Sequence, residues 1–235
     1  MDLFGKAFKD FYEGKQVELY IERDDGYLDR QDFSEYFEDY LYFPDVEKKA
    51  LTHAKGRVLD IGVGAGRVAL YLQSLGMEVV GLDISEHALE VSRLRGVKKL
   101  IRMSACELQL PEGSFDTAIA LGNNFGLCGT MDRVADMMRR LRRILSADGV
   151  FLAESVDPYN TDKEEHREYH RRNIERGRPP GQVTIRSRYM GQVDDWMELL
   201  MVTPGEMASL CADTGWRIEA SYPGSPYNVY VLTKS

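Results

Sequence analysis

A glycine-rich turn between two apolar runs constrains the fold of this chain more than any other segment. The first run, residues 58–61, leads directly into three glycines at alternate positions, Gly62, Gly64 and Gly66. Glycine has no Cβ and can adopt positive φ, so such a turn lets the backbone approach a ligand closely. The next apolar run, 79–82, ends in Asp83, where a carboxylate can accept hydrogen bonds from two ribose hydroxyls. The segment therefore indicates a site for a nucleotide-like cofactor at the ends of two neighbouring strands.

The spacing of the glycines separates two classes of cofactor. A dinucleotide-binding turn needs its third glycine at position 67, so that the helix N-terminus can receive a pyrophosphate, but this chain has Arg67 there. Asp60, at the end of the first run, would repel a pyrophosphate and suits a ligand that carries an ammonium and a sulfonium. A flavin or nicotinamide site is the alternative for such a turn. A turn without any ligand would leave Asp60 and Asp83 together unexplained.

The order Asp, any, Gly, any, Gly, any, Gly, followed by a second acidic residue, resembles the class I S-adenosylmethionine-dependent methyltransferases. The resemblance extends in order and spacing from residue 50 to residue 156. It implies S-adenosylmethionine as cofactor and S-adenosylhomocysteine as product, with Asp60 near the donor's amino group and Asp83 on the ribose. The cofactor-binding residues that it implies are Asp60, Gly62, Val63, Gly64, Gly66, Asp83, Ile84, Ser104, Ala105, Cys106, Leu121, Gly122 and Asn123.

Two loops depart from the pattern of this family. Where the family most often has an aspartate that accepts from the adenine amino group, this chain has Ser104, unless a shift of a residue or two brings in Glu107. The loop after the fourth predicted strand contains Asn124 and Phe125, which we expect to face the substrate. This loop lacks the Asn or Asp, Pro, Pro, aromatic stretch of some amino-group methyltransferases. Its absence disfavours an exocyclic amine or a glutamine as the acceptor.

Strands and helices alternate along the chain from residue 56, as in a parallel sheet with helices on both faces. Strands are predicted at 58–61, 79–82, 100–105, 115–121 and 150–156, followed by an antiparallel pair at 216–222 and 228–233. The predicted fold is α/β, a three-layer, doubly wound, seven-stranded mixed sheet of the Rossmann-like methyltransferase type. Its predicted parts are an N-terminal helical lid (1–50), a cofactor-binding core (51–156), a small inserted substrate cap (157–202) and the C-terminal part of the core (203–235).

Aromatic residues are concentrated at the N-terminus, where the first 43 residues contain 12 of the 24 in the chain. This density favours an ordered lid that shuts over the cofactor, excludes water and offers ring faces to a sulfonium or an apolar substrate. Tyr27 is the ring that we assign to the substrate. The alternative is that most of these rings pack the lid onto the sheet.

The predicted cap departs from the acidic balance of the chain, because residues 161–189 contain eight basic and five acidic residues. A helix over 162–176 and a β-hairpin, 183–190 with 194–202, are predicted there. Strand alternation puts Thr184, Arg186 and Arg188 on one face. Convergent guanidinium groups favour a carboxylate or phosphate on the substrate, so we assign Arg186 and Arg188 to substrate binding. The alternative is a solvated face paired with neighbouring glutamates.

His166 and His170 lie four residues apart on the predicted cap helix, so their imidazoles share a face. An imidazole can take the proton from a hydroxyl or an amine as the methyl group arrives. His166, His170 and Tyr169 between them are therefore the predicted catalytic residues. No metal site is predicted, because the pair lacks further ligands and Glu168 lies at the wrong offset for a zinc motif.

Composition narrows the classes of function. A net charge of -8 argues against nucleic acid as the main substrate, since nucleic-acid binders normally present a basic footprint. The three cysteines lie far apart, match no metal spacing and form no disulfide framework, which fits a reducing cytosol. No apolar run approaches roughly 18 residues and no signal segment is recognisable, so neither export nor a membrane span is expected. The predicted location is cytoplasmic.

The predicted function is methylation of an oxygen or nitrogen atom of a small-molecule acceptor, an anionic metabolite if the cap arginines bind it. Two alternatives stay open. An RNA or protein methyltransferase is supported only by the arginine cluster, and a non-catalytic S-adenosylmethionine-binding regulatory module is the third possibility. The acceptor atom, the pathway and the oligomeric state are not determined by the sequence.

Overall fold

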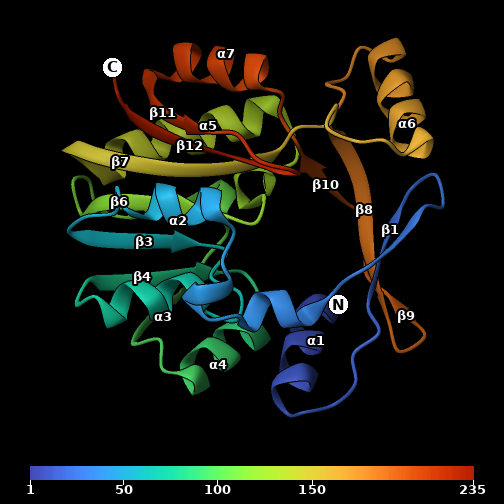
Figure 1. Ribbon diagram of the computed structural model, residues 1–235, viewed down its shortest axis with the longest axis horizontal. Helices are drawn as coiled ribbons and strands as arrows, with labels where there is room; N and C mark the ends of the chain where they lie inside the picture. The colour runs from blue at the N-terminus through green and yellow to red at the C-terminus, as the bar shows by residue number, and fades with distance from the viewer.

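The computed structural model describes all residues, 1–235, and contains two β-sheets (Figure 1). The larger sheet has seven strands in the order β11-β12-β7-β6-β3-β4-β5. These strands are β3 (Arg57–Ile61), β4 (Glu78–Asp83), β5 (Lys99–Arg102), β6 (Phe115–Ala120), β7 (Leu145–Val156), β11 (Trp216–Tyr222) and β12 (Tyr227–Lys234). Strands β3 to β7 are parallel, and β12 lies antiparallel between β7 and β11. The predicted mixed sheet with an antiparallel C-terminal pair is confirmed.

Helices cover both faces of this sheet, so the core has three layers as predicted. One face is covered by α5 (Met131–Ile144) and α7 (Pro204–Thr214), and the other by α2 (Asp45–Leu51), α3 (Arg67–Ser74) and α4 (Glu86–Arg95). Helix α7 shows how the local sequence fixes the ends of a helix: Thr203 and Glu206 form a capping box at its start, and Gly215 ends it in the left-handed conformation. None of the helices combines the length and the apolar composition needed to cross a bilayer.

The C-terminal strand pair completes the sheet beside β7. In the ladder between β12 and β7, Tyr227 lies opposite Val156 and Val229 opposite Glu154. The buried Trp216 of β11 donates from its indole nitrogen to the backbone carbonyl of Met138 at 3.1 Å. This hydrogen bond ties the strand pair to α5.

A second sheet joins the N-terminal segment to the cap (Figure 1). Its order is β10-β8-β1-β2, with β9 paired to β8. The strands are β1 (Tyr20–Arg23), β2 (Leu28–Arg30), β8 (Gln182–Tyr189), β9 (Gln192–Val193) and β10 (Met197–Leu200). Glu22 lies opposite Arg186 in this ladder, so segments 164 residues apart in the sequence pair directly.

The second sheet corrects part of the predicted lid. Residues 1–50 do contain helical segments, namely α1 (Leu3–Tyr12), α2 and the 3₁₀ turns η1 (Phe33–Phe37) and η2 (Tyr40–Tyr42). They also contain β1 and β2, which were not expected and which belong to the sheet of the cap. The predicted cap hairpin is present as β8 and β10, and the cap helix is α6 (Glu164–Glu175). The physical reason is that β8 would otherwise present an unpaired edge, which β1 covers.

The N-terminal aromatic residues mostly pack on one another. Phe4, Phe8, Phe33 and Tyr36 form edge-to-face pairs with ring centroids 5.2–5.7 Å apart. Phe8 also lies over the glycine turn, since a Cβ on Gly64 would be 3.4 Å from its ring. The aromatic cluster therefore holds α1 beside the glycine turn, in line with the packing alternative.

Candidate active site

The glycine turn connects β3 to α3 at the carboxyl end of the parallel strands. Gly62, Gly64 and Gly66 all have positive φ, between 54° and 85°. At Gly66 the requirement is also steric, because a Cβ would lie 2.7 Å from the side chain of Val97 and 2.9 Å from the hydroxyl of Ser92. Only glycine fits this conformation in this space. The turn thus has the open backbone that a close-bound ligand requires.

Asp83 stands at the end of β4, directly beside the glycine turn. Its Oδ2 accepts from the backbone N–H of Gly64 at 3.0 Å, and its Oδ1 accepts from that of Ser85 at 2.9 Å. Burial raises the pKa of this carboxyl group, and the two backbone donors oppose the rise. The next residue, Ile84, is 67% exposed. A fixed carboxylate flanked by an accessible apolar side chain suits the sugar and the base of a nucleoside.

The loop after β5 contains the three residues assigned to the adenine. Ser104 caps the 3₁₀ turn η3 (Ala105–Glu107), and its hydroxyl accepts from the backbone N–H of Cys106 at 3.2 Å. Cys106 and Cys128 form a disulfide with their Cα atoms 5.4 Å apart, while Cys211 is free and buried. The prediction that the cysteines form no disulfide is therefore wrong. Helix α5, which begins just after Cys128, packs against η3 and brings the two cysteines together.

The residues that follow β6 form a loop held by side-chain amides. Leu121 is buried and Gly122 is exposed. Asn123 has φ 60°, and its Oδ1 accepts from the backbone N–H of Val156 at 3.1 Å and from the hydroxyl of Ser155 at 3.2 Å. These bonds fix the loop to the end of β7. Gly122 is thus the exposed residue at the start of this loop.

The two residues predicted to face the substrate lie in the 3₁₀ turn η4 (Asn124–Gly126) and have different surroundings. Asn124 donates from Nδ2 to the carbonyl oxygens of Ile61 at 3.0 Å and Gly62 at 2.9 Å. It therefore joins the loop after β6 to the glycine turn. Phe125 is fully buried in the core, 6.1 Å from Phe151 between ring centroids, and presents no ring to a substrate.

Three carboxyl groups and one guanidinium are buried near the glycine turn on the side of α2 and α3. Arg67 donates to both carboxyl oxygens of Glu47, at 2.6 and 2.7 Å. Asp60 and Glu154 each keep one buried carboxyl oxygen, Oδ2 and Oε2, without a hydrogen-bond partner. The other oxygen of Glu154, Oε1, accepts from the backbone N–H of Gly122 at 3.0 Å. We refer to these four side chains, Glu47, Asp60, Arg67 and Glu154, as the carboxyl cluster.

Burial disfavours the ionised forms of Asp60 and Glu154. It raises the pKa of Asp60 to about 7, against the opposing charge of Arg67. Burial, and then the nearby carboxylate of Glu47, raise the pKa of Glu154 to about 8. The two unpartnered oxygens would be stabilised by a hydrogen-bond donor or a cation. Glu47, Arg67 and Glu154 were missed in the sequence, where the only signal for Glu154 was a single glutamate inside the apolar run 150–156.

The predicted catalytic residues lie on α6, in the cap. The hydroxyl of Tyr169 donates to Asp24 at 2.7 Å, and Nδ1 of His166 lies 3.1 Å from the hydroxyl of Thr161. Burial lowers the pKa of His170 to about 4, and its Nδ1 has no partner. These contacts hold α6 to the β1–β2 hairpin and to the segment before the helix. None of the three side chains is hydrogen-bonded to the glycine turn or to the carboxyl cluster.

The substrate-binding residues predicted in the lid and cap already contact other protein groups. Arg186 and Arg188 donate to the same oxygen of Glu22, at 2.7 and 3.0 Å. The hydroxyl of Tyr27 accepts from the ammonium of Lys163 at 2.8 Å. The arrangement matches the alternative in which the arginines pair with a glutamate.

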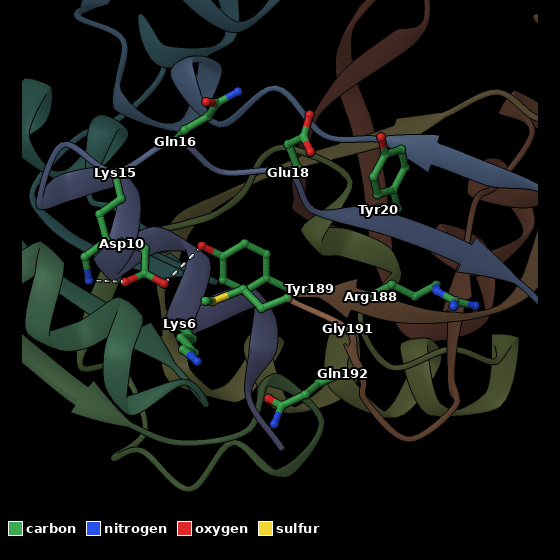
Figure 2. Close-up of a pocket in the computed structure, with 11 residues that line it drawn as sticks. Lys6, Asp10, Lys15, Gln16, Glu18, Tyr20, Arg188, Tyr189, Gly191 and Gln192 are labelled. Carbon is green, nitrogen blue, oxygen red and sulfur yellow. Dashed lines mark hydrogen bonds and ion pairs between the residues drawn. The ribbon is translucent and has the colours of Figure 1, made fainter.

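A surface cavity of about 880 Å³ lies elsewhere, between α1, β1 and the turn that joins β8 to β9 (Figure 2). Its lining carries charges of both signs, from Lys6, Asp10, Lys15, Glu18 and Arg188. Figure 2 shows the carboxylate of Asp10 between the ammonium of Lys15 and the hydroxyl of Tyr189, at 2.6 and 3.0 Å. No residue of the glycine turn or of the carboxyl cluster lines this cavity, so we do not assign it to the cofactor. No group of three or more His, Cys, Asp or Glu side chains in the structure is arranged to hold a metal ion.

The sequence and the fold of this chain are similar to those of known proteins. Residues 59–153 match a family model described as a methyltransferase domain. The whole chain is similar to a SAM-dependent methyltransferase from Bacteroides fragilis, whose crystal structure is a complex with S-adenosyl-L-homocysteine. The TM-score is 0.84 at 27% identity, and the match covers 100% of this chain and 95% of that one. The resemblance to the class I S-adenosylmethionine-dependent methyltransferases is therefore confirmed, in sequence over residues 59–153 and in fold over the whole chain.

The curated relatives match this chain over part of their length. The ubiquinone/menaquinone biosynthesis C-methyltransferase UbiE of Citrifermentans bemidjiense is 31% identical over 113 residues, which are 43% of this chain and 46% of the relative. The putative methyltransferase YqeM of Bacillus subtilis is 26% identical over 102 residues, 42% of this chain and 41% of the relative. The chain thus spans less than half the length of these two relatives.

The residues around the glycine turn fit S-adenosylmethionine, and the predicted resemblance and the cofactor that it implies are confirmed. The unpartnered Oδ2 of Asp60 is a buried acceptor that the donor's ammonium would satisfy. The glycine turn would receive the amino-acid portion, and Asp83 would accept from the ribose hydroxyls while Ile84 lies beside the base. The assignment of each individual contact stays a prediction.

Proposed function

We propose that this protein transfers the methyl group of S-adenosylmethionine to an oxygen or nitrogen atom of a small-molecule acceptor. The observation that carries the proposal is the pair of carboxyl groups on either side of the glycine turn. Asp60 offers a buried, unpartnered oxygen to an ammonium, and Asp83 offers a fixed carboxylate to ribose hydroxyls. The similarity in fold and sequence to a complex with S-adenosyl-L-homocysteine supports the same assignment.

The bound cofactor supplies a methyl group that its sulfonium has already activated. The residues of the chain then have three tasks: to hold the donor, to align the acceptor and to exclude water. Asp60 and Asp83 would fix the two ends of the donor. Alignment of the acceptor for in-line displacement can contribute on the order of 7 to 11 kcal/mol. Such a site needs little further chemistry beyond removal of a proton from the acceptor.

The elements around the carboxyl ends of the parallel strands would exclude water from the site. Phe8 of α1 lies over Gly64, and α1 also packs against β8 of the second sheet. Asn123 donates to the carbonyl oxygen of Leu200 at 3.4 Å and so links β10 to the loop after β6. The covering elements therefore contact the loops that would hold the donor.

A small-molecule acceptor is supported by the charge and the covering elements together. The net charge of -8 does not favour a polyanion, and β10 of the second sheet contacts the loop after β6. An anionic acceptor has less support than the sequence suggested, because Arg186 and Arg188 both contact Glu22.

The test measures release of S-adenosylhomocysteine by the purified protein in the presence of S-adenosylmethionine and a small-molecule extract of cells. We expect release that requires the extract and that falls more than about tenfold in Asp60→Ala at low donor concentration. The control variant is Glu112→Gln, an exposed residue in a turn. Stoichiometric binding without release would identify a non-catalytic module. Release only with RNA or protein would identify a macromolecular acceptor.

A further inference from the structure

Glu154 is a charged group that the assignment of the cofactor leaves unused. Within the carboxyl cluster, Glu47 is paired with Arg67, and Asp60 is assigned to the ammonium of the donor. Glu154 is 0% exposed, and its Oε2 accepts no hydrogen bond from an N–H or hydroxyl group, although the carboxyl group of Glu47 lies close enough to share a proton with it. A buried carboxyl oxygen without a donor is destabilising, and such groups in folded proteins call for an explanation. A ligand that brings a proton donor would provide one.

Glu154 is itself buried, but its carboxyl group contacts an exposed residue, Gly122, at the carboxyl ends of two strands. Its Oε1 accepts from the N–H of Gly122, and β6 and β7 lie side by side in the sheet. Gly122 is exposed, and no atom lies within 4 Å of the position that a Cβ would occupy there. Ligands of open α/β sheets bind at this end of the strands. Asn124 donates to the carbonyl of Gly62 at 2.9 Å, so the glycine turn borders the same loop.

The groups that face Glu154 offer mostly oxygen atoms to a ligand. They are Glu47 of α2, Arg67 of α3 and Tyr227 of β12, with Glu35 and Tyr36 of η1 beyond Tyr227. Arg67 is the one cation among them, and its hydrogen bonds go to Glu47. The remaining groups are carboxyls and hydroxyls. An acceptor that carries a cationic amine would find oxygen acceptors there, and its charge would favour the ionised form of Glu154.

We propose that Glu154 binds the amino group of an amine acceptor and removes the proton that the nitrogen must lose before methyl transfer. The inference rests on the proposed methyl transfer and names its acceptor class. The proton moves from the ammonium to Oε2 of Glu154, which leaves a lone pair on nitrogen. This lone pair forms the new N–C bond as the S–C bond breaks, and the electron pair of the broken bond stays on sulfur. The products are a methylated ammonium and a thioether.

The ionisation of Glu154 agrees with this role. Burial and the carboxylate of Glu47 raise its pKa to about 8, close to the pH at which a proton acceptor works well. An exposed glutamate has a pKa of about 4.3 and would take a proton from an ammonium far less readily. The rate of transfer should therefore rise with pH up to about 8.

The first test uses a probe that requires no knowledge of the acceptor. Sinefungin is an analogue of S-adenosylhomocysteine in which a carbon that bears a primary amine replaces the sulfur, so its ammonium occupies the place of the transferred methyl group. We expect Glu154→Gln to weaken binding of this probe by about tenfold or more and binding of S-adenosylhomocysteine by less than about twofold, measured by calorimetry. Glutamine keeps an acceptor for the N–H of Gly122 but removes the charge. Asp148→Asn, at an exposed position of the same strand, is the matched control and should change neither affinity.

The outcomes of this test separate the two proposals. An equal loss of affinity for both ligands in Glu154→Gln would overturn the assignment of Glu154. Failure of the wild-type protein to bind either ligand would overturn the proposed function and this inference with it. Glu154→Asp retains the charge on a shorter side chain, and we expect it to restore part of the preference for the ammonium probe. A well-folded Glu154→Asp variant with no preference would count against a role for the carboxylate.

The second test follows transfer itself. A cell extract is separated by charge into cationic, neutral and anionic small molecules, and each fraction is incubated with methyl-labelled S-adenosylmethionine. We expect label in the cationic fraction, with a rate about 100-fold lower in Glu154→Gln at an unchanged KM for the donor. Label found only in the anionic or neutral fraction would overturn the amine acceptor and leave methyl transfer intact.

Discussion

At the scale of single residues, two buried carboxyl groups should govern how stability responds to pH. Burial raises the pKa of Asp60 to about 7 and that of Glu154 to about 8, whereas both are about 4 in an unfolded chain. Between these values the folded protein holds protons that the unfolded chain has released. The contribution of these groups to the free energy of unfolding is therefore complete below pH 4 and is lost as the pH rises to about 8.

A variant that carries both Asp60→Asn and Glu154→Gln should remove this dependence. Without ligand, we expect it to melt several degrees above the wild type at pH 8, with a difference that shrinks toward pH 5, because the amides never carry the buried charge. Differential scanning calorimetry between pH 5 and pH 8 measures the difference. A difference that stays constant over this range would show that the two carboxyl groups are not the cause.

Asp83 allows a second prediction at the same scale. Replacement by alanine removes the acceptor for the ribose hydroxyls and the acceptor for the N–H groups of Gly64 and Ser85. We expect Asp83→Ala to weaken binding of S-adenosylhomocysteine by more than about tenfold in calorimetry. Glu86→Ala, at an exposed position three residues later, is the control. Equal affinities for wild type and Asp83→Ala would refute the ribose assignment.

The sequence identified the residues whose role depends on short spacing and missed those that long-range packing assembles. The glycines and Asp83 directly follow predicted strands. Their position at the carboxyl ends of the strands could therefore be predicted from their order in the sequence. Arg67 and Glu154 lie 87 positions apart, and nothing local signals that they share a cluster with Glu47. The same limit applies to Phe125, whose burial depends on packing against Phe151.

At the scale of elements, the junction between the cap and the core depends on close approach of two backbones. A Cβ on Gly126, in η4, would collide with the carbonyl group of Leu200 in β10. A Cβ on Gly129 would lie 2.7 Å from the Cβ of Glu198. Glycine at these positions lets β10 run directly against the loop after β6. At Gly126 the backbone of this loop therefore lies directly against the backbone of β10.

Replacement of Gly126 by alanine should separate these elements. We expect Gly126→Ala to lower the free energy of unfolding by about 1–3 kcal/mol, since backbone on one side has to move. The control is Gly205→Ala, in the first turn of α7, where the nearest atom to the added Cβ is 4.0 Å away. Urea unfolding compares the two variants. Equal stability of both would mean that the contact with Leu200 relaxes without cost.

The elements of the core were predictable because their hydrophobic runs, caps and glycine stops are local signals. The β1–β2 hairpin was not recognised, although Asp25 and Gly26 form a typical turn between its strands. The aromatic residues on either side favoured a helical interpretation. What fixes β1 as a strand is its pairing with β8 far along the chain, and strand formation depends strongly on such context.

At the scale of the whole molecule, the charge distribution should decide between classes of acceptor. The net charge is -8, and three arginines of the cap contact carboxylates from the N-terminal segment: Arg172 contacts Asp25 at 3.2 Å, and Arg186 and Arg188 contact Glu22. We expect the protein to pass through a heparin column at moderate salt, because its net charge is negative and these cap arginines are already paired with carboxylates. Retention at about 0.2 M salt would favour an RNA acceptor instead.

The shared sheet of the lid and the cap has a consequence for protein engineering. Residues 20–30 and 182–200 form one hydrogen-bonded ladder, in a register that places Tyr20 opposite Arg188. Replacement of either stretch alone by the corresponding stretch of a similar protein would leave mismatched strand edges. Such unpaired edges promote aggregation. Chimeras that aim at new specificity should therefore exchange both stretches at once, as a single cassette divided between two places in the coding sequence.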